Sequence, residues 1–295
     1  MNRFRFLFLI GILSVSCSTG ERSETESAEI AVSVFPVADI VQHIAGDSIR
    51  AQTLIPPGAN PHTFEPQPAL IKSLQSVRLY IGVNPEFDGW VLRYLPNSCH
   101  TVFLRDDHPQ HGEHENPHLW LSVQIVKSLL PVIQNALTEM FPEQDKEFLI
   151  NTNLYITQLD SVDDLLEQQF IGADKPFIQY HPAWDFLAKD YGLSILGTIS
   201  MGHGETGSVK SFETLIRTAR EQDAHIIVAG VNEESPLLAA LAAEIDGQVL
   251  RLSTLGDPAN PEQNSYLKLM AWNGKRLSDV LKGPVQANKA VNGVK

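Results

Sequence analysis

The sequence predicts an α/β protein with two Rossmann-like lobes, each built on a parallel sheet, and one long rigid helix that joins them. Strand-like runs alternate with helical segments in both halves of the chain, and this alternation is typical of parallel sheets. A single helical pattern covers residues 143–171 between the two halves. The 295 residues are enough for two such lobes.

The N-terminus has the pattern of a targeting segment. Arg3 and Arg5 precede an apolar run, Phe6–Leu13, which small residues and then Cys17 follow. The run is too short to span a bilayer permanently. A cysteine at this place resembles the processing site of a bacterial lipoprotein signal, although Ser14 stands where leucine is usual. We therefore expect a signal peptide over residues 1–17, a lipidated Cys17, and a flexible polar tether over residues 18–28.

The first lobe is expected over residues 29–141, where β-branched runs mark strands and apolar residues at helical spacing mark helices. The expected strands are Glu29–Phe35, Ile49–Ile55, Val77–Val83 and Thr101–Leu104. The expected helices are Val37–Gly46, Pro68–Ser76, Phe87–Tyr94 and Val123–Phe141, the last kinked at Pro131. The run Pro56–Pro66 contains four prolines and a glycine, so we expect a non-helical turn, and it carries His62.

The connecting helix is expected over residues 142–172. Its apolar stripe repeats at helical spacing through Phe148, Tyr155, Leu159, Val162, Leu166 and Phe170. A helix of this length would extend about 45 Å. It is therefore expected to act as a rigid connector and not as a flexible linker.

The second lobe is expected over residues 173–283, with a disordered tail over residues 284–295. Its expected strands are Pro176–Tyr180, Ser194–Ile199, His225–Ala229 and Gln248–Leu252. Its expected helices are Trp184–Tyr191, Ser211–Gln222, Ser235–Ile245 and Ser265–Leu281. A glycine-rich loop over residues 201–207 carries His203.

Charge and cysteine content restrict the function. The net charge of −13 argues against nucleic acid as a partner, because its phosphates require a basic surface, and it suits a protein that handles cations. If processing makes Cys17 the acylated first residue, Cys99 is the only other cysteine. No intramolecular disulfide and no cysteine-pair zinc site is then available, so a metal site must use histidine and carboxylate.

Histidines are concentrated between residues 106 and 122. His108, His111 and His114 lie in a polar, carboxylate-rich loop, whereas His118 is followed directly by Leu119-Trp120-Leu121. Neutral imidazole is the commonest protein ligand for zinc. A polar loop with incidental histidines is the alternative, but four histidines beside a run of carboxylates favour a metal.

His62 and His181 each follow a predicted strand, one in each half of the chain. Functional residues of parallel sheets gather at the carboxyl ends of the strands. A turn histidine or a helix cap explains either residue if it is considered alone. Taken with His118, the two indicate ligands that converge from different loops, as tetrahedral zinc requires.

The surrounding motifs resemble a known family, the zinc-binding substrate-binding proteins of bacterial ABC transporters. The resemblance lies in Asn60-Pro-His-Thr-Phe-Glu-Pro, in Asn116-Pro-His-Leu-Trp-Leu, in the run His181–Leu193 and in the final helix Ser265–Leu277. It covers about Glu29 to Leu281. It implies that His62, His118 and His181 bind the metal, and that His181 favours zinc, because manganese-selecting relatives have glutamate at the third position.

One position departs from this family. Its usual aspartate after the last strand corresponds to Ser253, and a serine hydroxyl is a poor zinc ligand. His203 is the fourth ligand that we expect, while Asp257 and water are the alternatives. The histidines at 108, 111 and 114 resemble the family's histidine-rich loop, which either collects zinc at low affinity or serves as a solubilising hinge.

The function implied is an extracytoplasmic, membrane-anchored zinc receptor. It would deliver Zn²⁺ as cargo to an ABC permease and its ATPase, act as a monomer and perform no chemistry. The alternatives are a zinc hydrolase, with Glu65 or Glu205 as the base, and a surface adhesin on the same fold.

Overall fold

The computed structural model describes residues 28–105, 116–202, 205–206 and 208–282. The predicted signal peptide, Cys17, most of the tether, the loop with His108, His111 and His114, residue His203 and the C-terminal tail lie outside these residues. Among the described residues, no helix is both long enough and apolar enough to cross a membrane.

The N-terminal lobe is built on a parallel four-stranded sheet in the order β2-β1-β3-β4. Its strands are β1 (Ile30–Val32), β2 (Ala51–Thr53), β3 (Leu79–Gly82) and β4 (His100–Phe103). Its helices are α1 (Phe35–Ala45), α2 (Pro68–Ser73), α3 (Pro85–Asp88) and α4 (Val123–Met140), with 3₁₀ turns at Pro61–Thr63, Leu74–Ser76, Gly89–Tyr94 and Leu119–Leu121.

The C-terminal lobe has a second parallel four-stranded sheet, in the order β10-β9-β5-β6. Its strands are β5 (Phe177–Gln179), β6 (Ile195–Thr198), β9 (Ile226–Gly230) and β10 (Gln248–Leu252). Its helices are α6 (Asp185–Asp190), α7 (Val209–Glu221), α8 (Pro236–Glu244) and α9 (Tyr266–Lys282). A separate antiparallel ribbon pairs β7 (Ser200–Gly202) with β8 (Glu205–Thr206).

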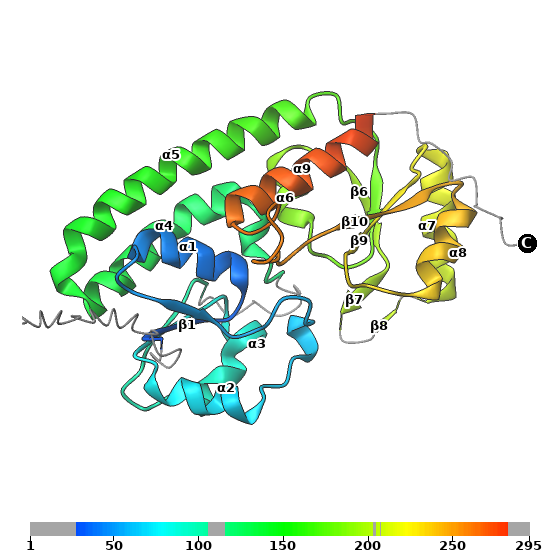
Figure 1. Cartoon of the computed structure of the whole chain (residues 1–295). Coiled ribbons are helices and arrows are strands. Elements are labelled where there is room, and N and C mark those ends of the chain that lie inside the picture. Colours follow the sequence, from blue (N-terminus) through cyan, green and yellow to red (C-terminus); the bar gives the residue numbers. More distant parts are fainter. Residues whose placement is uncertain (1–27, 106–115, 203–204, 207, 283–295) are drawn as a thin grey trace, which may run out of the picture.

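The two lobes are joined by α5 (Asp145–Phe170), a helix of 26 residues that follows a 3₁₀ turn at Pro142–Gln144. Figure 1 shows α5 running along one side of the molecule, with α4 and α9 beneath it. Five of the six residues of its predicted stripe are buried, and Val162 is half-buried. The predicted fold class, two parallel α/β lobes joined by a long helix, is confirmed.

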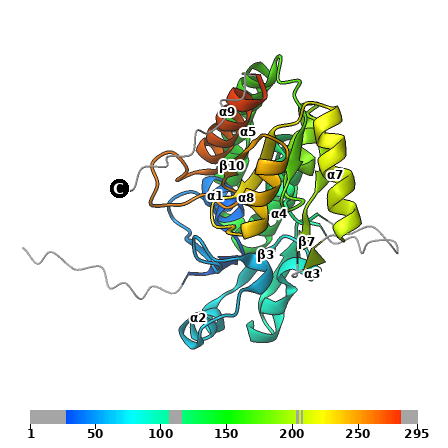
Figure 2. The same cartoon turned by 90° about the vertical axis from the view of Figure 1, so that its right-hand side faces the viewer.

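Alternation along the strands gives each sheet two faces. In the C-terminal lobe, Phe177 and Val228 pack toward α5 and α9, while Ile178 and Ile227 pack toward α7 and α8. Figure 2 shows α7 and α9 on opposite sides of this lobe. The cluster on the first face continues into the N-terminal lobe through α1 and α4. One hydrophobic core is therefore shared by both lobes.

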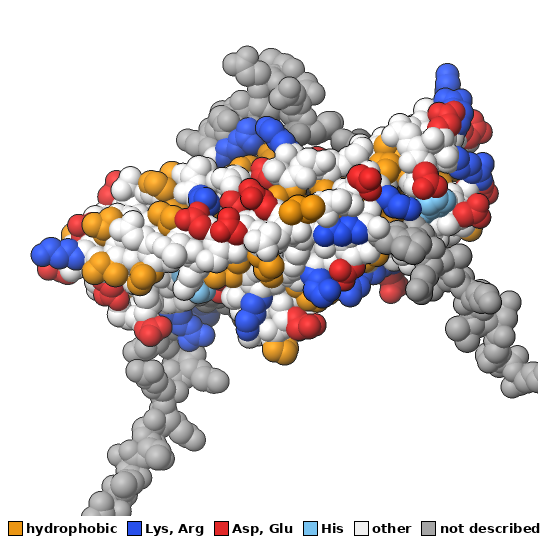
Figure 3. Space-filling model, turned by 90° about the horizontal axis from the view of Figure 1, so that it is seen from above, with side chains coloured by type: hydrophobic (Ala, Val, Ile, Leu, Met, Phe, Trp, Pro, Cys, Tyr) orange, Lys and Arg blue, Asp and Glu red, His pale blue; other side chains and the backbone are white. Residues whose placement is uncertain are grey.

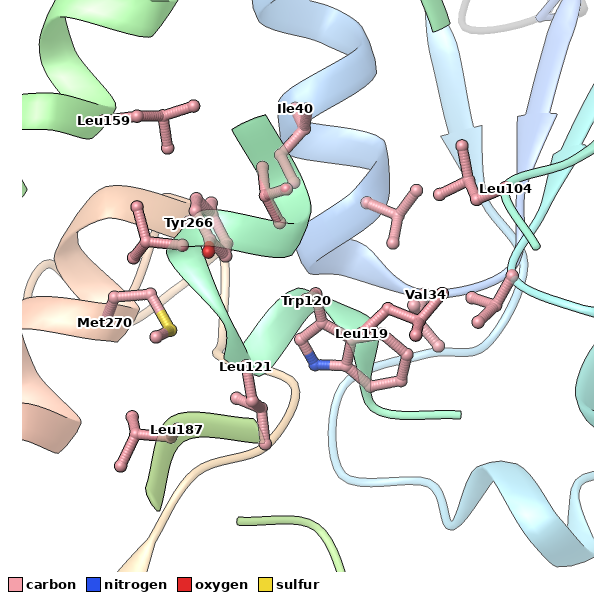
Figure 4. Packing of buried hydrophobic residues seen from close by; sticks show 14 of the residues in the cluster. Val34, Ile40, Leu104, Leu119, Trp120, Leu121, Leu159, Leu187, Tyr266 and Met270 are labelled. Atoms are coloured by element: carbon pink, nitrogen blue, oxygen red, sulfur yellow. The ribbon is translucent and has the colours of Figure 1, made fainter. Parts of the chain in front are cut away.

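The segment Leu119-Trp120-Leu121 lies at the centre of this shared core. Its three side chains are 3%, 1% and 0% exposed. In Figure 4 they lie between Val34 on the N-terminal side and Leu187 on the C-terminal side. The indole Nε1 of Trp120 donates to the carbonyl oxygen of Thr254 at 2.6 Å, which ties the first lobe to the turn after β10.

Local details differ from the sequence prediction. The run Pro56–Pro66 contains one 3₁₀ turn, Pro61–Thr63, which a proline at its first position permits. The predicted helix Phe87–Tyr94 is divided between α3 and a 3₁₀ helix. The described residues of the glycine-rich loop, 201–202 and 205–206, lie in the β7–β8 ribbon. Helix α4 continues through Pro131, which is exposed, so that water can satisfy the carbonyl that a proline leaves without a partner.

Candidate metal site

A cavity of about 430 Å³ lies at the junction of the lobes. Its walls come from the segments that follow the carboxyl ends of strands in both sheets, where parallel α/β folds place their ligand sites. The lining residues used below follow β2 (Pro61 and Thr63), β4 (His118), β5 (His181), β6 (Ser200), β9 (Glu233) and β10 (Ser253).

His118 enters this cavity from the shared core. It is 5% exposed and immediately precedes the buried 3₁₀ turn Leu119–Leu121, whose last amide donates to the His118 carbonyl at 3.0 Å. Its ring lies against Trp120, with 5.3 Å between the ring centroids. Asn116 Oδ1 lies 2.7 Å from His118 Nδ1 and accepts from the His118 amide at 3.0 Å. The imidazole is therefore held by packing on one side and by a hydrogen bond on the other.

His181 reaches the cavity from the opposite lobe, two residues after β5. The preceding residue, Tyr180, donates from its amide to Val228 O at 2.7 Å and accepts from the Ser200 amide at 2.7 Å. The His181 carbonyl accepts from the Ala183 amide, also at 2.7 Å. Its half-buried ring is thus placed by backbone bonds that continue the sheet.

The rings of His118 and His181 meet across the junction. Their centroids are 5.0 Å apart and their planes are inclined at 77°. Two imidazoles bound to one tetrahedral zinc at the usual Zn–N length have centroids about 5 Å apart. The spacing of this pair therefore fits a shared metal ion.

His62 lies in the 3₁₀ turn Pro61–Thr63, whose other two residues both line the cavity. The Thr63 amide donates to Asn60 O at 3.2 Å, which closes this turn. The backbone of His62 thus lies between two residues of the cavity wall, while its side chain lies outside what the structure describes, so its role as a ligand stays a prediction. Among the described side chains, no group of three or more His, Cys, Asp and Glu residues is arranged to hold a metal.

The positions considered for a fourth ligand differ in their surroundings. Ser253 lines the cavity but is 3% exposed, and its Oγ accepts from the Gly256 amide at 3.0 Å. Asp257 is not among the lining residues, and its Oδ1 accepts from the Ala259 amide at 2.9 Å. His203 is not described, although Ser200, which begins the ribbon leading to it, lines the cavity.

Glu233 is a cavity residue that the sequence analysis missed. Its Oε2 accepts from the Gly230 amide at 2.6 Å, and a Cβ at Gly230 would lie 3.2 Å from the Glu233 side chain, so a small residue is favoured there. Burial raises the pKa of the Glu233 carboxyl. One signal in the sequence could have identified Glu233. It lies three residues after the end of β9, and β9 is the neighbour of β10, the strand that Ser253 follows.

The rival hydrolase loses one of its candidate bases. Glu65 is exposed and is not among the residues that line the cavity, so its carboxylate is not positioned to activate a metal-bound water. The side chain of Glu205 is not described.

On the face in Figure 3, acidic and basic side chains are interspersed and the coloured residues form no continuous basic patch.

Two lobes that meet at a cavity, with a histidine from each, are the architecture of a two-lobed binding protein. The chain matches the family described as zinc-uptake complex component A, periplasmic, over residues 30–280, and it belongs to that family. The resemblance inferred from the motifs is confirmed. Family membership identifies a metal-receptor component of a zinc-uptake system.

The relatives agree with this assignment. The chain is 25% identical over 301 residues to the high-affinity zinc uptake system protein ZnuA of Bacillus subtilis, with 94% of each covered. It is 24% identical over 294 residues to the zinc-binding lipoprotein AdcA of Streptococcus pneumoniae, covering 91% of this chain but 58% of that relative. A crystal structure of a ZnuA deletion mutant with zinc bound has a TM-score of 0.77 at 23% identity and covers 88% of this chain and 100% of the other, which shows the same fold.

Proposed function

We propose that this protein is an extracytoplasmic zinc receptor that holds one Zn²⁺ ion between its lobes and delivers it to an ABC permease driven by an ATPase. His62, His118 and His181 are the proposed ligands. The observation that carries the proposal is the 5.0 Å pairing of the His118 and His181 rings across the lobe junction. Nitrogen ligands favour zinc over harder cations such as Mg²⁺ and Mn²⁺.

The proposal explains why the ligands come from both lobes. His118 and His181 are 63 residues apart in the chain. An ion that binds both therefore links the two lobes. Movement of one lobe relative to the other would remove ligands from the ion and allow its release. The shared core would keep such a movement small.

The fourth coordination position is proposed for His203, with Glu233 as the alternative. Ser253 is less suited, since its hydroxyl already accepts the Gly256 amide. A Glu233 carboxylate would reduce the charge of the bound ion, but its Oε2 already accepts from the Gly230 amide, which restricts where the side chain can reach. Asp257 is ranked below both because it is not among the cavity residues.

The chain is further proposed to be a monomer anchored by lipid on Cys17. Two or more acyl chains would hold it at the membrane surface through the polar tether. Cys17→Ser is expected to move the protein from the detergent phase to the aqueous phase. If the variant stays in the detergent phase, the anchor lies elsewhere. His108, His111 and His114 are proposed as a low-affinity zinc-collecting loop.

The ligand assignment is tested by competition titration of zinc against a chelator. His62→Ala, His118→Ala and His181→Ala are each expected to weaken zinc binding at least about tenfold, because even a lost outer-shell contact costs 10–100-fold. His100→Ala is the matched control, since His100 is partly exposed on β4 and does not line the cavity. Unchanged affinity in any of the first three variants would remove that histidine from the site.

The hydrolase is the second candidate function, because a zinc ion bound by three histidines would have a fourth position open to water. Esterase and peptidase assays with the zinc-loaded protein are expected to give no turnover. Turnover that disappears in His118→Ala would overturn the receptor assignment.

A further inference from the structure

A neutral histidine offers only one unprotonated ring nitrogen to a metal, so its tautomer decides which atom binds. In His118 the environment of Nδ1 is well defined, because Asn116 Oδ1 lies 2.7 Å away. The same oxygen accepts from the His118 backbone amide at 3.0 Å. An amide N–H requires an acceptor, so the atom of Asn116 that faces His118 is its oxygen. His118 Nδ1 must then carry the proton and donate it.

The other end of the Asn116 amide crosses the lobe junction. Asn116 Nδ2 donates to Asp185 Oδ2 at 3.2 Å, and Asp185 is the first residue of α6 in the C-terminal lobe. A carboxylate only accepts hydrogen bonds. Asp185 would therefore face a second acceptor if the Asn116 amide were turned over. The orientation of Asn116 is thus set from both lobes at once.

Asp185 is in turn held by a buried group. Gln179 is 1% exposed, and its Nε2 donates to Asp185 Oδ1 at 2.6 Å and to Thr198 Oγ1 at 3.0 Å. Gln179 Oε1 accepts from the Trp184 amide at 3.2 Å, so this amide cannot turn over either. Both oxygens of Asp185 are occupied by amide donors, although the residue itself is exposed.

We propose that Asn116 and Asp185 are positioning residues that fix the His118 tautomer from across the lobe junction. The chain of hydrogen bonds from Gln179 through Asp185 and Asn116 keeps the proton on Nδ1, so that Nε2 is the unprotonated nitrogen that binds the metal. The Asn116–Asp185 bond joins the lobes, so the ligand is fully prepared only when they are together. Separation of the lobes releases one end of Asn116 and weakens this selection. The proposal depends on the proposed function only in assigning His118 to the zinc ion.

The test reads the tautomer directly, without metal. Long-range ¹H–¹⁵N correlation spectra of the histidine rings are recorded on the zinc-free protein at about pH 8, well above the usual histidine pKa of about 6.5. In the wild type, His118 is expected to carry its proton on Nδ1. In Asn116→Ala and in Asp185→Ala, a population protonated on Nε2 is expected, the form that free histidine favours in water. Asp185→Asn is expected to act in the same direction, because one of the two accepting oxygens becomes an NH₂ group, which cannot accept from Gln179 or from Asn116.

Asp190→Ala is the matched control. Asp190 lies on the same helix α6 and accepts from Ser122 Oγ at 2.5 Å, so the variant also breaks a bond between α6 and the segment that contains His118. Its His118 tautomer should remain that of the wild type. Zinc titration should show a loss of roughly 10–100-fold in Asn116→Ala, within the range of other outer-shell partners. The loss should be smaller in Asp185→Ala, where the His118 amide still holds Asn116.

Two results would overturn the inference: an Nε2-protonated His118 in the wild type, or an unchanged Nδ1-protonated His118 in both alanine variants. Either result is compatible with zinc binding by the wild type that is lost in His118→Ala, in which case the proposed function stands alone. Conversely, a wild type that binds no zinc removes the proposed function, while the tautomer measurement still decides the role of Asn116 and Asp185.

Discussion

His118 and His181 face each other across one cavity, but the two lobes hold them in different ways. His118 is buried and precedes three buried residues of the shared core. His181 is half-buried and is held mainly through backbone bonds around the end of β5. The first ligand is thus tied to packing that involves both lobes, and the second to the sheet of its own lobe. Substitutions near His118 are therefore expected to lower the stability of the whole molecule, whereas substitutions near His181 are expected to affect mainly the C-terminal lobe.

The largest effect is expected for Trp120→Ala. This side chain is 1% exposed in the shared core, and truncation of such a residue costs about 3–5 kcal/mol of unfolding free energy. Zinc affinity should also fall, because the ring contact with His118 is lost. Urea unfolding and zinc titration measure the two effects. Trp90→Ala is the control, since Trp90 packs only partly buried against the core; an equal loss in both variants would contradict a special role for the junction.

The second largest effect on stability is expected from Asp88, whose carboxyl group is buried within the N-terminal lobe. Burial raises the pKa of Asp88 to about 6, although the amides of Val83 and Asn84 donate to its carboxylate. The native state therefore binds this proton more tightly than the unfolded chain does. The unfolding free energy is therefore lowered by ionisation of Asp88. This loss is absent below the ordinary pKa of 3.8, grows between pH 3.8 and about 6, and is complete above that pH.

This loss amounts to about 3 kcal/mol, the energy of the pKa difference. The unfolding free energy of the wild type should thus decrease by about that amount, relative to Asp88→Asn, as the pH rises from about 4 to about 7. Denaturant unfolding at several pH values provides the measurement. Parallel pH profiles for the two proteins would show that Asp88 titrates normally.

The third effect is on zinc affinity. Substitution of the residue in the fourth coordination position is expected to weaken zinc binding about tenfold, which is equivalent to about 1.4 kcal/mol. His203→Ala should weaken zinc binding while Glu233→Gln leaves it unchanged, if the ribbon supplies the ligand. The reverse pattern would assign Glu233. If neither variant changes the affinity but Ser253→Asp tightens it, water occupies the position and both assignments are wrong. Competition titration of the three variants decides among these outcomes.

The smallest effect is expected for Trp120→Phe, which keeps an aromatic ring in the core but removes the indole donor to Thr254 O. A typical hydrogen bond contributes about 1 kcal/mol, so the loss of stability should be of that order. The bond joins the lobes, so faster dissociation of zinc is also expected in stopped-flow measurements. A change as large as that in Trp120→Ala would show that the ring fit, and not the hydrogen bond, is responsible.

The sequence alone determined the architecture and the principal candidate residues. Alternating strand and helix patterns predicted both parallel sheets, and the apolar stripe of residues 148–170 predicted the connecting helix, because these signals are local and periodic. The positions of His62 and His181 after predicted strands followed from the same reasoning, and that of His118 from the apolar run that follows it. The ligand assignment itself stays a prediction.

Only the tertiary structure decided which polar groups meet. Asn116 and Asp185 are 69 residues apart, and Trp120 and Thr254 are 134 residues apart, yet each pair shares a hydrogen bond. No local pattern encodes such pairs, because they depend on how two lobes pack against one core. The same holds for Glu233, whose cavity position depends on the order of β9 and β10 in the sheet. Periodic burial can be predicted from neighbours in the sequence, whereas a site between lobes is set by contacts that the sequence separates.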